Sequence, residues 1–114
     1  MTTQALLHVL SRCTDSARTA EFNTWYNDVH IPDVLELDEF KSVRRYQLGL
    51  SNIDDMPQYL AVFEVETDDV EATREVMLAH IRGKAATGTV TRHDLLDGAS
   101  LSWYVQIFNS ATVD

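Results

Sequence analysis

The sequence predicts an α+β domain in which four strands and two helices follow one another in the order βαββαβ. Four segments carry apolar side chains in alternation, several of them on both faces, as buried strands do. Two other segments repeat apolar side chains at the spacing of a helix that packs on a core. At 114 residues, with 45% hydrophobic and 24% charged side chains, the chain is expected to form one domain spanning residues 1–114.

Four strands are predicted, over Gln4–Leu10, Phe40–Leu50, Gln58–Glu66 and Leu101–Phe108. The first, third and fourth are apolar on both faces, so we expect both faces of the sheet to be covered. Alternation in the second strand is imperfect between Val43 and Tyr46, which predicts a β-bulge there.

The first helix is predicted from about Ser16 to His30, behind several candidate N-cap residues. Pro32 disfavours the helical conformation in the residue before it. We therefore expect the helix to break or kink at His30 and to be followed by a short turn over Pro32–Leu37.

The second helix is predicted to begin after Thr67, where acidic residues complement the helix dipole, and to end at Gly83 as its C-cap. Residues 84–99 show no clear strand pattern. A segment of this length in a small domain is often a binding loop or a lid.

Composition excludes several classes of partner. The net charge of −9 argues against nucleic acid and against anionic membrane surfaces, because both bind basic proteins. No secretory signal or membrane-spanning segment is expected, since the N-terminal residues form no basic leader and no long apolar run. The single cysteine fits a reducing compartment, so we expect a cytoplasmic location.

The order βαββαβ is the ferredoxin-like arrangement, a four-stranded antiparallel sheet with both helices on one face. The second face is too apolar to remain in water, and another copy of the chain can cover it, which predicts a homodimer. The space enclosed there would contain a few polar groups, with His8, Tyr104 and Gln106 as candidates. Such a space predicts a pocket for a small hydrophobic molecule.

The stretch Phe22–Leu35 carries the most unusual chemistry of the chain. Phe22, Trp25 and Tyr26 lie on one helical stripe, and His30 lies on its flank, where a side chain is half buried and still reachable. That position suits a titrating group. The same residues also fit an amphipathic helix that ends at a proline and carries a surface histidine.

A set of residues in this stretch continues into the next strand: Phe22, Trp25, Tyr26, Asn27, His30, Pro32, Asp33 and Leu35, followed by Arg45 and Tyr46. This pattern resembles the EthD-type members of the dimeric α+β barrel superfamily. The superfamily includes cofactor-free polyketide cyclases and dehydratases, muconolactone-type isomerases, quinol-forming monooxygenases and haem-degrading enzymes. The resemblance implies a dimeric α+β barrel in which His30 transfers protons. Ile31 stands where many such proteins have a small residue, which changes the shape of the pocket.

A histidine base suits enolisation of a carbonyl or phenolic substrate, and from there isomerisation, dehydration or cyclisation. An enolate needs a hydrogen-bond donor as it forms, and a base needs a group that orients it. The predicted catalytic residues are His30, Asp33 as its orienting carboxylate, and Tyr26. The predicted substrate-binding residues are His8, Asn23, Trp25, Tyr46, Tyr104 and Gln106.

The four histidines, His8, His30, His80 and His93, lack the spacing of a metal-binding motif, so we expect no metal and no cofactor. Two other functions remain open. One is a cofactor-free or haem-linked monooxygenase, with His8 or His80 as an axial ligand by analogy with the superfamily. The other is a non-catalytic dimeric module that binds a small hydrophobic molecule.

Overall fold

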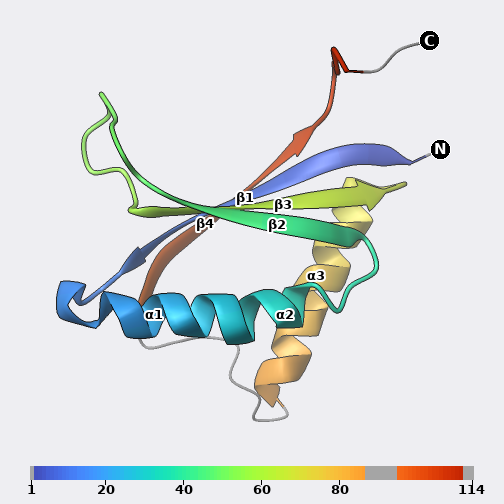
Figure 1. Ribbon diagram of the computed structural model, residues 1–114. Helices are drawn as coiled ribbons and strands as arrows, with labels where there is room; N and C mark the ends of the chain where they lie inside the picture. Colours follow the sequence, from blue (N-terminus) through green and yellow to red (C-terminus); the bar gives the residue numbers. More distant parts are fainter. Residues whose placement is uncertain (1, 87–94, 112–114) are drawn as a thin grey trace.

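The computed structural model describes residues 2–86 and 95–111 and has the predicted α+β architecture (Figure 1). The strands are β1 (Thr3–Cys13), β2 (Phe40–Gln47), β3 (Tyr59–Thr67) and β4 (Leu96–Val105). They form one antiparallel sheet in the order β2-β3-β1-β4. The helices lie on one side of this sheet (Figure 1), so the ferredoxin-like prediction is confirmed.

The central strand β1 contributes one face to the core. Ala5, Leu7, Val9, Ser11 and Cys13 alternate with less buried residues along this strand and are themselves buried. Buried side chains of β3 alternate in the same way, and the two strands pair without interruption from Thr3–Thr67 to Ser11–Tyr59. Alternation therefore defines a helix-covered face and an open face of the sheet.

The predicted β-bulge between Val43 and Tyr46 is wrong. Pairing of β2 with β3 is regular across this stretch, and its register shifts between Phe40 and Ser42 instead. The imperfect pattern has another cause: Arg45 occupies a position of the helix-covered face, where an apolar residue is usual. The irregular alternation thus reflects a charged side chain on the helix-covered face, and the backbone itself is regular.

The chain between β1 and β2 forms a continuous helical path. It comprises a 3-10 turn η1 (Ser16–Arg18), α1 (Thr19–Trp25), a π-helical turn η2 (Tyr26–His30) and α2 (Ile31–Val34). Asp15 caps its start, because its side chain accepts a hydrogen bond from the backbone N–H of Ala17 at 2.9 Å.

The break expected at His30 does not occur. His30 and Ile31 keep right-handed helical angles, and the backbone N–H of Ile31 bonds to the carbonyl of Tyr26, five residues earlier. Pro32 has no N–H, and in a regular helix its ring would collide with the carbonyl four residues before it. Widening into one π-helical turn relieves this conflict without ending the helix.

The second half of the chain differs from prediction at the end of α3 and at both ends of β4, which stops at Val105 rather than at Phe108. Helix α3 (Val70–Ala86) continues past Gly83, which is therefore not its C-cap. Strand β4 begins at Leu96, so the segment 84–99 expected to lack structure contributes to both elements. Backbone pairing of Leu96 and Asp97 with β1 holds this part of β4 in the sheet. The binding loop or lid expected here falls on residues 87–94, outside the described residues.

The core lies between the sheet and the helices. Phe22 and Tyr26 from the helical path and Phe63 and Val65 from β3 are almost completely buried, and Met77 joins them from α3. Aromatic contacts run across this layer, among them Phe22–Tyr59, Phe40–Phe63 and Phe40–Trp103, with ring centroids about 6 Å apart.

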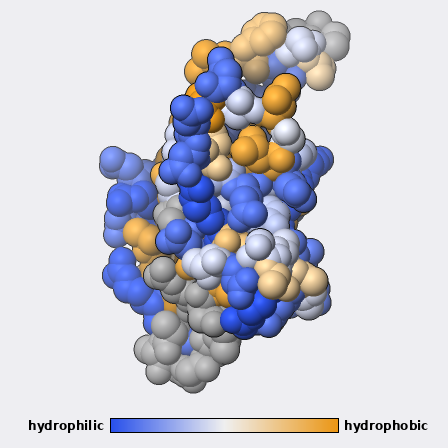
Figure 2. Space-filling model, turned by 90° about the vertical axis from the view of Figure 1, so that its left-hand side faces the viewer, coloured by the Kyte–Doolittle hydropathy of each residue, from blue (hydrophilic) through white to orange (hydrophobic). Residues whose placement is uncertain are grey.

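The open face carries apolar side chains that the helices do not cover. Leu6 on β1, Tyr46 on β2 and Tyr104 on β4 are exposed there. Figure 2 shows hydrophobic surface on the upper part of the molecule, on the side of the sheet away from the helices. At the ends of the sheet, Leu50 and Ile107 are exposed almost fully.

Replacing Phe63 by alanine tests this description of the core. Phe63 is 1% exposed and packs its ring against Phe40, so we expect Phe63→Ala to lower the free energy of unfolding by about 3–5 kcal/mol. Val76→Ala is the control, because Val76 is exposed on α3 and should change stability by less than about 1 kcal/mol. Denaturant titration measures both. Equal effects would contradict the assignment of the core.

Candidate functional site

The π-helical turn η2 places Tyr26 and His30 one turn apart on the helical path. Tyr26 is buried, and the half-buried His30 ring packs against it nearly at right angles, with centroids 4.9 Å apart and an interplanar angle of 73°. His30 also stacks on the indole of Trp25, with centroids 5.2 Å apart. Two aromatic side chains therefore hold the orientation of the imidazole.

Arg45 of β2 reaches the same tyrosine from the sheet. Its guanidinium lies over the ring of Tyr26 at 4.1 Å and near the ring of Tyr59 at 5.3 Å. One nitrogen, Nη1, donates a hydrogen bond to Oδ1 of Asn27 at 2.9 Å. Asn23 completes the arrangement, because its Nδ2 donates to the hydroxyl of Tyr59 at 3.5 Å.

We call the six residues Asn23, Tyr26, Asn27, His30, Arg45 and Tyr59 the η2–β2 cluster. Burial raises the pKa of the Tyr26 phenol to about 12, although the positive charge of Arg45 opposes part of this effect. Burial also lowers the pKa of Arg45, and the two tyrosines oppose that shift. At neutral pH the cluster therefore contains a protonated phenol beside a cation.

Several donors in the cluster are buried without a hydrogen-bond partner in the part of the chain that the structure describes. They are the Tyr26 hydroxyl and the Nε and Nη2 atoms of Arg45. Unpaired buried donors cost free energy, and native proteins contain few of them. Donors gathered in one place are suited to bind an oxygen that carries negative charge.

Asp33, the predicted orienting carboxylate, lies towards α3. Its Oδ1 is 3.6 Å from Nζ of Lys84, which also forms an ion pair with Glu36 at 2.7 Å. His80 lies in the same group, with its Nε2 2.8 Å from the backbone carbonyl of Asp33. These contacts join α2 to α3, and a role of Asp33 in orienting His30 stays a prediction.

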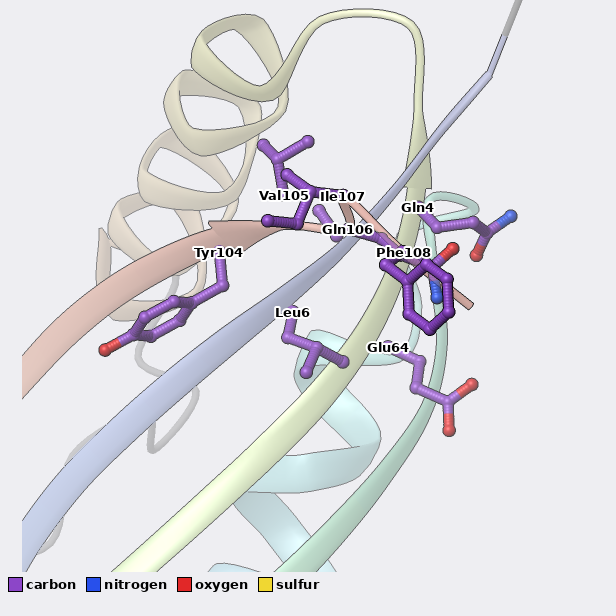
Figure 3. Close-up of a pocket in the computed structure, with 9 residues that line it drawn as sticks. Gln4, Leu6, Glu64, Tyr104, Val105, Gln106, Ile107 and Phe108 are labelled. Carbon is purple, nitrogen blue, oxygen red and sulfur yellow. The ribbon is translucent and has the colours of Figure 1, made fainter. Parts of the chain in front are cut away.

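The remaining predicted site residues lie on the other side of the sheet. His8 and Tyr104 stack there with ring centroids 4.7 Å apart, and Tyr46 is exposed on β2. A groove of about 510 Å³ runs beside Tyr104 but does not include His8 or Tyr46, and it is lined by Gln4, Leu6, Glu64, Tyr104, Gln106 and Phe108 among others. Leu6, Glu64 and Tyr104 point to the same side of the sheet (Figure 3).

The predicted site thus divides into two groups on opposite faces. Asn23, Trp25, Tyr26 and His30 belong to the helical layer, whereas His8, Tyr46, Tyr104 and Gln106 belong to the open face or to the segment that follows it. Sequence reasoning did not include Arg45, Tyr59 and Asn27 in the site. The available signal was the charge of Arg45 at a position where alternation calls for an apolar residue.

Binding of a metal ion or haem depends on the donor side chains that the structure brings together. No group of three or more His, Cys, Asp or Glu residues suited to hold a metal ion occurs within residues 2–86 and 95–111. His80 suits an axial haem ligand poorly, because its Nε2 already contacts the carbonyl of Asp33. His93 lies outside the described residues. In the same ranges, no helix combines the length and apolarity required to span a membrane.

Comparison with solved structures places the fold in the EthD-like α+β class. An ethyl tert-butyl ether d (EthD) family protein from Bacillus halodurans matches with a TM-score of 0.55 and 19% identity, covering 92% of this chain and 99% of that one. HapK from Hahella chejuensis matches with a TM-score of 0.53 and 12% identity, covering 97% of each chain. The resemblance to EthD-type proteins is confirmed for the fold.

The chain belongs to the family described as a domain of unknown function, DUF4286, which matches residues 6–92. That range includes the whole helical path, β2, β3 and the η2–β2 cluster. No curated protein matches the chain.

Because of Tyr26, the free energy of unfolding should fall at high pH. Its phenol stays protonated in the folded state up to a pKa of about 12, whereas the unfolded chain ionises it from about pH 10. The contribution of Tyr26 to the free energy of unfolding is therefore fully present below about pH 10 and is lost as the pH rises towards 12. Relative to Tyr26→Phe, the wild type should lose about 2–3 kcal/mol over this range. Denaturant titrations of both proteins at several pH values measure the difference, and parallel pH profiles would contradict it.

Proposed function

We propose that the protein is a cofactor-free lyase or isomerase, of the cyclase or dehydratase type, that uses His30 for general acid–base catalysis. Its substrate is a small hydrophobic carbonyl or phenolic compound. The observation that carries this proposal is the position of His30 against Tyr26 and Trp25, half-buried and beside the donors of the η2–β2 cluster. Enolisation requires a base held in position, here the imidazole of His30, and hydrogen-bond donors for the enolate oxygen.

In the proposed reaction, His30 takes a proton from a carbon next to the substrate carbonyl. The electron pair of the broken C–H bond forms the enolate, and its oxygen accepts a hydrogen bond from the Tyr26 hydroxyl. Tyr26 suits this role because its raised pKa keeps the phenol protonated at neutral pH. His30 then returns the proton to a different carbon in an isomerisation, or to a departing hydroxide in a dehydration.

The proposal includes a homodimer in the cytoplasm. Burial of the open face by a second copy would remove Leu6, Tyr46 and Tyr104 from water. It would also enclose the groove beside Tyr104 and Gln106. Because this groove lies on the face opposite His30, we assign the reacting group of the substrate to the helical layer and leave the groove to the dimer interface.

Proton exchange tests the role of His30 without knowledge of the natural substrate. Small 1,3-dicarbonyl and phenolic carbonyl compounds are incubated with the protein in deuterated water, and NMR follows replacement of the acidic C–H by C–D. Where the wild type accelerates exchange, His30→Ala should lower the rate by about 10²–10⁴-fold. Its thermal midpoint should remain close to that of the wild type, because His30 is only half-buried.

His80→Ala is the matched control, since His80 is a second half-buried histidine that binds Asp33 rather than the cluster. It should leave the exchange rate unchanged. Equal exchange in His30→Ala and wild type would remove His30 from the mechanism. Binding of the probes by the wild type without exchange would favour a non-catalytic binding module.

The dimer makes a separate prediction. Light scattering at low micromolar concentration should give twice the 12.9 kDa mass of the chain. Val62 lies on the open face opposite His8, so Val62→Asp should shift the protein towards monomer by placing a charge in the interface. Val76→Asp, on the exposed surface of α3, is the control and should stay dimeric. A monomeric wild type would overturn the assignment of the open face.

A further inference from the structure

Arg45 is a half-buried cation that has no acidic partner among the residues that the structure describes, in a chain that is rich in acid. The sequence has 18 acidic and nine basic side chains, excluding histidine. Four other arginines, Arg12, Arg18, Arg44 and Arg74, each form an ion pair with an aspartate or glutamate. Within the described residues no carboxylate forms an ion pair with Arg45, and its contacts are Asn27 and two tyrosine rings.

The two nitrogens of the Arg45 guanidinium that have no partner among the described residues lie along one edge of the group. Nη1 is engaged with Asn27, whereas Nε and Nη2 have no hydrogen-bond partner in the parts of the chain the structure describes. Nε and Nη2 form one edge of the guanidinium, and their two N–H groups point the same way. This edge binds a carboxylate through two parallel hydrogen bonds.

We propose that Arg45 binds a carboxylate of the substrate through its Nε and Nη2 atoms. The proposal rests on the proposed function and narrows its substrate class to small aromatic or enolisable carboxylic acids. A single guanidinium balances one negative charge, which suits a carboxylate better than the double charge of a phosphate monoester. The buried Tyr26 hydroxyl supplies a further donor beside it.

The arrangement places this carboxylate close to the imidazole of His30, the proposed base. The guanidinium carbon of Arg45 lies 4.1 Å and the ring centroid of His30 lies 4.9 Å from the centroid of the Tyr26 ring, so the two groups are at most about 9 Å apart. A ligand about the size of one substituted aromatic ring can therefore span from the guanidinium to the imidazole. The carboxylate would fix the position of the reacting carbon relative to His30.

Nε and Nη2 are shielded from solvent in the structure, so the ligand reaches them when the side chains above this edge move aside. Shielding also removes water that would compete for the two N–H groups. The Coulomb attraction between the two charges is consequently greater there than on the surface, and it offsets the cost of desolvating the carboxylate.

Binding of simple probes tests the inference. Calorimetry or NMR titration compares 2-hydroxybenzoate and benzoate with the uncharged benzamide, which has a similar shape. The wild type should prefer the carboxylates. Arg45→Gln should weaken carboxylate binding by about tenfold to a hundredfold and leave benzamide binding unchanged, because hydrogen bonds to a charged group are lost.

Arg44→Gln is the matched control. Arg44 is the adjacent residue of the same strand, but it faces the other side and pairs with Glu64, so its replacement should not change carboxylate affinity. Arg45→Lys covers the case in which Arg45→Gln does not fold. Lysine keeps the positive charge but cannot form two parallel hydrogen bonds to a carboxylate, so Arg45→Lys should weaken carboxylate binding as well.

Three results would overturn the inference: no carboxylate binding by the wild type at millimolar concentration, equal affinity for benzamide, or unchanged carboxylate affinity in both Arg45 variants. His30→Ala separates this inference from the proposed function, because it should lose proton exchange and keep carboxylate affinity. Exchange by a wild type that binds no carboxylate would preserve the role of His30 and remove that of Arg45.

Discussion

Burial of the Tyr26 phenol is the constraint on which the candidate site depends. The ring lies between the helical path and the sheet, and Phe22, Trp25, His30 and Arg45 all contact it. Because the surroundings shield its hydroxyl from water, ionisation is disfavoured and the group remains a donor. The same shielding makes the charge of Arg45 costly unless π-electrons or an anion compensate it. Burial of Tyr26 thus keeps its own hydroxyl protonated and makes the neighbouring charge of Arg45 depend on a compensating group.

The sheet separates two surfaces that serve different purposes in our proposal. The helix-covered side contains the buried polar and charged groups of the η2–β2 cluster, whereas the open side presents exposed aromatic and aliphatic side chains beside the ion pair of Arg44 and Glu64. Adjacent residues of one strand illustrate the division, since Arg45 faces the cluster and Arg44 pairs with Glu64 on the opposite side. Alternation along a strand is therefore sufficient to keep the proposed catalytic residues apart from the proposed dimer interface.

Sequence reasoning recovered the element order and the ferredoxin-like fold because each segment has a clear hydrophobic period. It failed where distant contacts decide the structure. Leu96 and Asp97 have no strand pattern of their own, yet their backbone pairs with β1. At Pro32, local preference predicts a break, but packing of Trp25 and Tyr26 into the core keeps the helix intact as a π-helical turn. For the site, His30 and Tyr26 were identifiable by spacing, whereas Arg45 stood in the EthD-like pattern without a role, and the register with β3 is what places it beside Tyr26.

The π-helical turn also restricts how the length of this chain can vary. Such a turn holds one residue more than a regular turn and absorbs it without rotating the helix beyond, whereas a further inserted residue would rotate everything beyond it by about 100°. The stacking of His30 on Trp25 spans η2, and the contact of Asp33 with Lys84 lies beyond it. A further insertion between Trp25 and Asp33 would therefore break at least one of these contacts. Such insertions should be rare in related proteins, and insertions should be more frequent in the exposed connection between β2 and β3.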